Sequence, residues 1–65
     1  MEGLRSGVYQ HVSGFYARVL FFAYEKEDDE YRAIYVPLQE YEGERIRSRK
    51  VSIFLKKYTY VGSLL

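Results

Sequence analysis

Three arginines at alternate positions carry the clearest chemical signal in this sequence: Arg45, Arg47 and Arg49. In an extended strand, alternate side chains project from the same face at intervals of about 6–7 Å. An arginine guanidinium donates paired hydrogen bonds to carboxylates and phosphates. The spacing therefore predicts a strand face that binds an acidic or phosphate-bearing partner.

Further basic and aromatic residues follow these arginines and would widen the same face: Lys50, Lys56, Lys57, Tyr58 and Tyr60. Tyrosine beside arginine is typical of protein interfaces. Our leading hypothesis is a non-enzymatic interaction module that binds a partner protein through this Tyr/Arg-rich face. The alternative is a barrel that binds RNA or single-stranded DNA, with Tyr58 and Tyr60 as stacking platforms for bases.

The arginines also have a purely structural explanation. Acidic residues within the same chain, either Glu40, Glu42 and Glu44 or the acidic stretch Glu25–Glu30, would neutralise them in cis. Charged side chains on an edge strand also resist edge-to-edge aggregation. The sequence leaves this explanation open beside the two binding hypotheses.

Charge is unevenly distributed along the 65 residues, although the formal net charge is only +1. Residues 25–44 contain eight acidic and two basic residues, a net charge of −6, whereas residues 45–57 contain six basic residues and no acid, a net charge of +6. The small overall charge does not indicate a strong, non-specific binder of nucleic acid.

No set of residues indicates catalysis. His11 is the single histidine, and no nucleophile elbow, phosphate-binding glycine loop or paired carboxylates accompany it, so we expect it to hydrogen-bond a backbone carbonyl or a turn. The acidic stretch lacks the glycine of a calcium loop, and the chain has no cysteine. We therefore predict no catalytic residue, no cofactor and no metal site.

The elements that would position the basic face are short strands. Phe15–Tyr24 is the longest apolar run, and its odd residues from Phe15 to Ala23 alternate as the dry face of a strand. Further strands are predicted at 7–12, 31–36, 44–51 and 55–61, with a charged hairpin at 25–30. At 52–54 we predict a tight turn or a short 3₁₀ piece that places Ile53 or Phe54 in the core. This pattern predicts an all-β fold, a small five-stranded antiparallel barrel of Src-homology-3-like type, with an open sheet as the alternative.

One domain is expected. Residues 1–6 would be a flexible lead, 7–61 the β-barrel domain and 62–65 a C-terminal tail. The apolar run of ten residues is shorter than the roughly 20 that a membrane helix needs, so we expect no membrane association. The lack of cysteine fits a reducing compartment, so we expect a cytoplasmic location. Leu20 and Phe22 would form a patch that leaves a homodimer open.

The sequence also resembles a family of small bacterial proteins known as domain of unknown function 1653. The resemblance covers about residues 9–55 and lies in Tyr9, His11, Gly14, Tyr16, Val19-Leu20, Ala23, the acidic stretch 25–30, Tyr31-Arg32-Ala33, Tyr35, Leu38, Gly43, Arg47 and Phe54-Leu55. It implies a compact β domain and no particular activity. The family's fourth strand usually carries a Trp and an Arg-Pro pair, whereas residues 45–49 here read RIRSR, so a ligand held by that Trp would be lost or changed.

Overall fold

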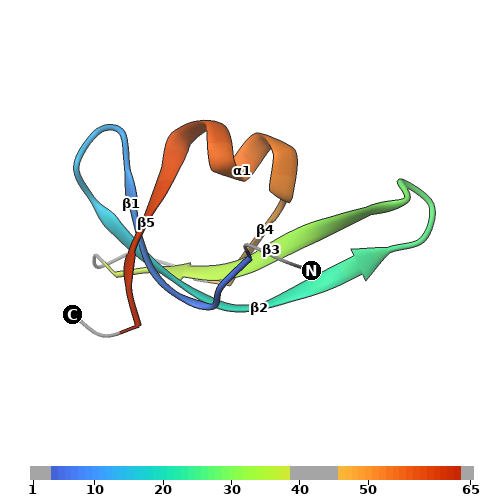
Figure 1. The fold of residues 1–65 in the computed structure, drawn as a ribbon, viewed down its shortest axis with the longest axis horizontal. Coiled ribbons are helices and arrows are strands. Elements are labelled where there is room, and N and C mark those ends of the chain that lie inside the picture. The colour runs from blue at the N-terminus through green and yellow to red at the C-terminus, as the bar shows by residue number, and fades with distance from the viewer. Residues whose placement is uncertain (1–3, 39–45, 64–65) are drawn as a thin grey trace.

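Five strands and one short helix make up the part of the chain that the structure, a computed structural model, describes: residues 4–38 and 46–63. The elements are β1 (Gly7–His11), β2 (Tyr16–Glu25), β3 (Glu30–Pro37), β4 (Arg47–Lys50), α1 (Val51–Lys57) and β5 (Tyr58–Gly62) (Figure 1). None of the helices in these two ranges is long and apolar enough to cross a membrane.

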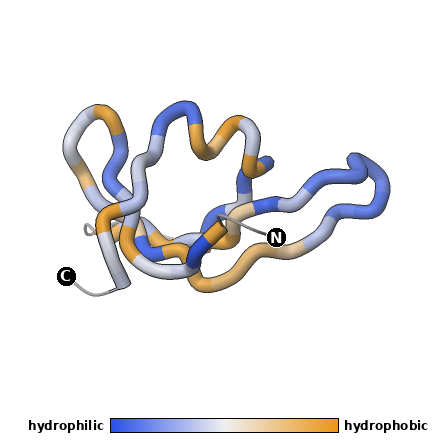
Figure 2. Tube along the Cα trace, viewed as in Figure 1, coloured by the Kyte–Doolittle hydropathy of each residue, from blue (hydrophilic) through white to orange (hydrophobic). Residues whose placement is uncertain are grey.

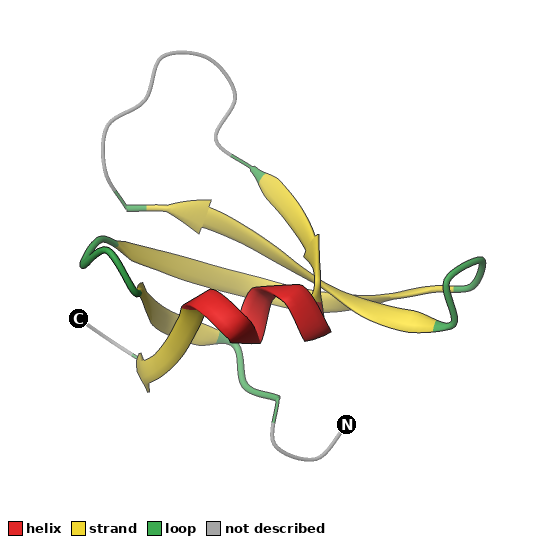
Figure 3. Cartoon of the chain, turned by 90° about the horizontal axis from the view of Figure 1, so that it is seen from above, coloured by secondary structure: helices red, strands yellow, loops and turns green. Residues whose placement is uncertain are grey.

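The strands form one antiparallel sheet in the order β4-β3-β2-β1-β5. This confirms the predicted small all-β domain with five antiparallel strands. β4 and β5 are the two edges, and hydrogen bonds between them do not close the sheet, so the barrel is a loose one. Helix α1 connects the two edge strands and lies across one face of the curved sheet (Figures 1 and 3).

Strand β2 changes its inward-facing residues at a bulge. Val19 lies opposite Tyr35 and Phe21 opposite Ile34, so Leu20 is the extra residue. Before the bulge Ala17 and Val19 are buried, whereas after it Phe22 packs against the core and Phe21 is 54% exposed. The predicted alternation was therefore wrong beyond Leu20, because an inserted residue moves every later side chain to the opposite face.

The β2–β3 hairpin extends beyond the rest of the sheet, and its tip is hydrophilic (Figures 1 and 2). The tip comprises residues 26–29, within the predicted charged hairpin at 25–30. Asp29 adopts φ 49°, a left-handed conformation that aspartate tolerates better than most residues. The predicted second and third strands are thus joined as expected, and each is longer by one residue at the hairpin.

The core is aromatic and is centred on Phe54 of α1, which is fully buried. Its ring stacks on Tyr58 at a centroid distance of 4.3 Å and meets Tyr9 and Tyr35 at 5.2 and 5.1 Å. Three tyrosines from three different strands therefore surround one phenylalanine of the helix. Such pairs add about 0.5–1.5 kcal/mol each beyond the area that they bury.

Two boundaries differ from the predictions after β4. Residues 52–54 belong to the α-helix α1 rather than to a tight turn or a short 3₁₀ piece, and the fifth strand begins at Tyr58 rather than Leu55. Phe54 did enter the core, as one of the two residues proposed for that place. Lys56 and Lys57 occupy the last helical turn, where positive charge is favoured by the helix dipole.

Two earlier boundaries also differ from the predictions. The first strand ends at His11, one residue before the predicted end, because Val12 already lies in the turn. Within the described residues, β4 begins at Arg47.

Candidate basic pocket

A pocket of about 290 Å³ lies between β4 and the junction of α1 with β5. The β1–β2 turn and the end of β3 complete its wall. Its lining residues are basic or aromatic apart from one proline: His11, Phe15, Tyr35, Pro37, Arg47, Arg49, Lys57 and Tyr58. Four separate parts of the chain thus bring positive charge and aromatic surface to one place.

The arginines of β4 reach the pocket because of the register with β3. Arg47 lies opposite Tyr35 and Arg49 lies opposite Ala33, and both β3 residues are buried in the core. Directly opposed residues of antiparallel strands project from the same face. Both arginines therefore emerge on the inner, concave side of the sheet, and both are exposed there. Arg45, the first member of the predicted triplet, lies outside the described residues.

Lys57 and Tyr58 enter the pocket from the opposite side, where α1 becomes β5. Tyr58 is only 8% exposed because its ring stacks on Phe54. Lys57, the last helical residue, is exposed. The pocket therefore has a packed aromatic base and an exposed cationic side chain at its rim.

His11 is held in one orientation at the pocket wall. Its Nδ1 accepts a hydrogen bond from the backbone N–H of Ser13 at 3.0 Å and lies 2.8 Å from the Ser13 hydroxyl. The ring stacks on Phe15 at 4.4 Å and meets the edge of Tyr58 at 4.9 Å. The predicted hydrogen bond to a turn is confirmed. Because Nδ1 accepts, the neutral ring carries its proton on Nε2, which leaves an N–H donor.

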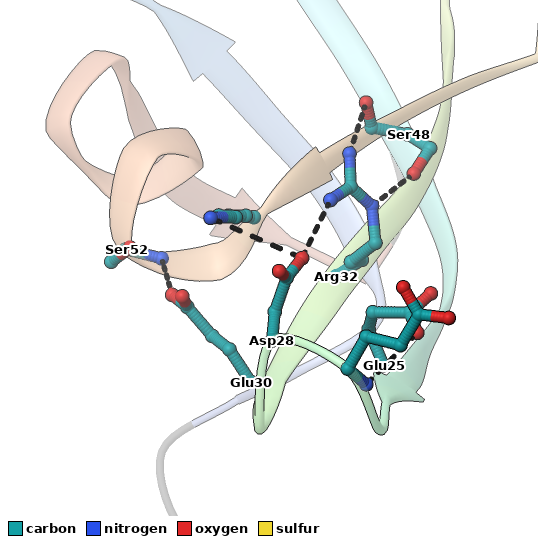
Figure 4. Close-up of polar contacts among 8 residues, drawn as sticks. Glu25, Asp28, Glu30, Arg32, Ser48 and Ser52 are labelled. Carbon is teal, nitrogen blue, oxygen red and sulfur yellow. Dashed lines mark hydrogen bonds and ion pairs between the residues drawn. The ribbon is translucent and has the colours of Figure 1, made fainter.

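The contacts of the acidic hairpin lie elsewhere on the molecule. Asp28 approaches Arg32 at 3.8 Å and Lys50 at 3.9 Å, and Arg32 also donates to the Ser48 hydroxyl at 2.7 Å (Figure 4). Arg32 and Lys50 oppose each other between β3 and β4, one position away from Ala33 and Arg49, so they occupy the outer face. Among the described residues, no acidic side chain lines the pocket. Glu40, Glu42 and Glu44, the other acids that would neutralise the arginines, lie outside the described residues.

Glu30 at the base of the hairpin contacts the helix instead. Its Oε1 accepts a hydrogen bond from the Ser52 backbone N–H at 3.1 Å (Figure 4). Hydrogen bonds from Ser52, first from its hydroxyl and then from its N–H, lower the pKa of the Glu30 carboxyl, and the charges of Lys50 and Arg32 add to the effect. The hairpin therefore braces the start of α1, which carries the pocket residue Lys57 at its other end.

The structure brings together four of the eight residues predicted for the binding face: Arg47, Arg49, Lys57 and Tyr58. Lys50 points to the outer face near Asp28, and Lys56 does not line the pocket although it neighbours Lys57. Tyr60 packs edge-on against Tyr9 at 5.3 Å, with the Arg5 guanidinium 4.9 Å from its ring centre. The predicted stacking platform of Tyr58 and Tyr60 is therefore not formed, because both rings pack against other side chains.

Sequence reasoning missed Phe15, Tyr35 and Pro37 as pocket residues and assigned His11 a structural role alone. Tyr35 and Pro37 share a strand face by simple alternation, which was a usable signal. The convergence of this face with the end of α1 depends on the curl of the sheet and had no local signal. Within the described ranges, no group of three His, Cys, Asp or Glu residues is placed to hold a metal ion.

Fold and pocket together define a small all-β domain with a loose five-stranded barrel, one bridging helix and a basic, aromatic-based pocket. A crystal structure of a protein of the DUF1653 family from Bordetella bronchiseptica is similar to it, with a TM-score of 0.87 and 27% sequence identity over 100% of this chain and 96% of that chain. The resemblance to domain of unknown function 1653 is thus confirmed and extends over the full length of the chain. No family model matches the sequence, and no curated protein matches it.

Proposed function

We propose that this protein is a non-enzymatic interaction module that binds an acidic group of a partner protein in the basic pocket. The observation that carries the proposal is the convergence of three cationic side chains, Arg47, Arg49 and Lys57, on one pocket whose described lining contains no acid. Like charges repel, so a fold that gathers these three cations is stabilised when an anion is bound between them. Binding of a carboxylate-bearing segment would supply that anion.

The size and the base of the pocket support a small acidic ligand. Small-molecule sites usually have volumes of about 300–1,000 Å³, so 290 Å³ is at the lower limit and suits acidic side chains of a peptide or a chain terminus. The aromatic base would exclude water from the anion, which strengthens its attraction to the guanidinium groups. Arginine adds directional, paired hydrogen bonds to the carboxylate.

A binding role is favoured over a catalytic one by the state of His11. Its Nδ1 is engaged by Ser13 and its ring is stacked on Phe15, so the ring is fixed as a hydrogen-bond donor through Nε2. General base catalysis would require an imidazole nitrogen that is available to accept a proton from a reacting group. We therefore assign His11 to anion binding within this proposal.

Single-stranded nucleic acid is the second candidate, because its phosphates are also suited to the basic pocket. Its bases, however, would need exposed aromatic faces on which to stack. Tyr35 is 4% and Tyr58 8% exposed, and Tyr60 is packed between Tyr9 and Arg5. The packing of these rings therefore favours an acidic protein segment over RNA or single-stranded DNA.

A further part of this proposal is that the loose barrel is of the Src-homology-3-like type that interaction modules often use. It is supported by the strand order β4-β3-β2-β1-β5 and by the helical connection between the two edge strands. Fold alone does not fix function, so the test must address the pocket itself.

The test is a fluorescence anisotropy titration with two labelled probes, a glutamate-rich decapeptide and a single-stranded oligonucleotide, each at low and moderate salt. We expect the peptide to bind the wild type and to bind the Arg49→Gln and Lys57→Gln variants several-fold more weakly. Lys56→Gln is a matched control, since Lys56 lies on the same helical turn but does not line the pocket. Equal peptide binding by all variants, or binding of the oligonucleotide alone, would contradict the proposal.

A further inference from the structure

The position of the pocket at an edge of the sheet carries information on how a partner would bind. β4 pairs with β3 on one side, and no other strand in residues 4–38 or 46–63 pairs with it on the other side. The pocket is lined by the inward-facing residues Arg47 and Arg49 of this same strand. The basic pocket and the edge of the sheet are therefore adjacent.

We propose that the acidic partner binds as an extended strand added to the outer edge of β4. This inference rests on the proposed function and names the form of its ligand: a peptide with acidic residues at alternate positions. A strand added to a sheet edge gains main-chain hydrogen bonds, while its alternate side chains enter pockets on one face. Arg47 and Arg49 are two residues apart, so the acids that face them must also be two residues apart.

The positive charge of β4 favours an acidic partner strand over a second copy of this chain at its outer edge. Two copies paired through β4 would bring a strand with the sequence Arg47-Ser48-Arg49-Lys50 against an identical strand. Like charges directly opposite each other in a sheet are destabilising, and opposite charges are stabilising. An acidic strand is therefore the complementary occupant, and self-pairing through this edge is disfavoured.

The charges on the two faces of β4 indicate which face of the added strand carries its acidic residues. Lys50 lies opposite Arg32 on the outer face, and Asp28 of the hairpin lies within 4 Å of both side chains. The acidic hairpin thus supplies negative charge to the outer face of β4, whereas the described lining of the inner face contains none. Acidic residues of the added strand would accordingly face inward, beside Arg49 and towards Lys57.

Peptides of identical composition test this inference. The first probe is a labelled heptapeptide with glutamates at positions two, four and six, separated by threonine and valine. The second contains the same residues with its three glutamates adjacent. We expect the alternating peptide to bind more tightly, by up to roughly fivefold for each cross-strand ion pair that the isomer cannot make. In Arg49→Gln, this preference should decrease, whereas in Lys56→Gln it should remain.

Two further measurements separate strand addition from simple charge attraction. N-methylation of backbone amides on the peptide edge that faces β4 should abolish the preference, and methylation on its other edge should not. Hydrogen exchange of the β4 amides should slow when the alternating peptide binds.

Equal binding of the two isomers without protection of β4 would overturn strand addition but leave the basic pocket as an anion site. Absence of binding by either peptide would remove the proposed function as well. A dimer in solution that dissociates on mutation of β4 would show instead that this edge pairs with a second copy.

Discussion

The carboxylate of Glu30 accepts a hydrogen bond from the backbone N–H of Ser52, 22 positions later in the chain, at 3.1 Å. This contact joins the base of the β2–β3 hairpin to the first turn of α1. Lys50, which precedes the helix, provides no side-chain cap, so the cap comes from a different element. Helix α1 thus depends on the hairpin for its start, although the two are adjacent only in space.

Replacing Glu30 by Gln should destabilise the fold at neutral pH and have little effect in acid. The folded-state pKa of Glu30 is lowered from its usual value of 4.5, so its contribution is fully present above that pH and is lost as the pH falls through the lowered pKa. Urea denaturation of wild type and Glu30→Gln between pH 7 and pH 2 should show two stabilities that converge in acid. Glu27→Gln, at the hairpin tip, is the control, and its free energy of unfolding should change with pH in the same way as that of the wild type.

Replacing Phe54 by Ala should cost about 3–5 kcal/mol, because a fully buried ring is lost and a cavity remains. A domain of this length has a total stability of roughly 3–10 kcal/mol, so the variant should be largely unfolded at 37 °C. Phe54→Leu should retain the fold with a smaller loss. Thermal unfolding followed by near-ultraviolet circular dichroism reports the tyrosines that surround this ring. Near-wild-type stability of the Ala variant would contradict the central role of Phe54.

Replacing Gly7 by Ala should be more destabilising than replacing Gly14 by Ala. Both glycines have positive φ, 131° and 108°, so both substitutions carry backbone strain of roughly 1–3 kcal/mol. At Gly7 the added Cβ would also lie 2.8 Å from the carbonyl oxygen of Gly62 in β5, whereas at Gly14 no atom lies within 4 Å. Comparing the unfolding free energies of the two variants isolates the cost of separating β1 from β5. Equal losses would show that the two strands adjust to the methyl group.

Replacing Lys57 by Gln should leave the protein at least as stable as replacing Lys56 by Gln. Both residues occupy the last turn of α1, so each substitution removes the same favourable interaction with the helix dipole. Only Lys57 lies in the pocket with Arg47 and Arg49, where its removal relieves repulsion. Urea denaturation at low salt should show the difference, and added salt should reduce it by screening. A greater loss for Lys57→Gln would assign that side chain a structural role.

The sequence predicted those parts of the fold that depend on local pattern. Alternation located β1, β2 and β3, and the charged residues after Tyr24 located the hairpin tip. The bulge at Leu20 left no signal in the sequence, because the run around it is apolar on both faces. The sequence therefore did not predict that Phe22, rather than Phe21, packs against the core. Helix α1 was missed because Val51–Lys57 is only seven residues long, too short for helical periodicity to emerge, and its start is capped from a distant strand.

The sequence predicted that basic residues would gather on one face, but it did not predict correctly which residues line the pocket. Arginines at alternate positions correctly indicated a shared face for Arg47 and Arg49, since that depends only on strand geometry. Lys56 and Tyr60 were assigned to the same face by extending a strand through residues that form a helix and a core contact. His11 and Tyr35 joined the pocket through the curl of the sheet, which is a property of the whole chain.

Strand β5 pairs with β1, and Gln10 lies opposite Thr59, so the sheet joins strands from opposite ends of the sequence. Such a topology has a high contact order, because loop-closure entropy must be lost before these distant residues gain their contacts. We expect this domain to fold in milliseconds to seconds rather than in microseconds. During synthesis on the ribosome, one edge of β1 therefore stays unpaired until β5 has emerged.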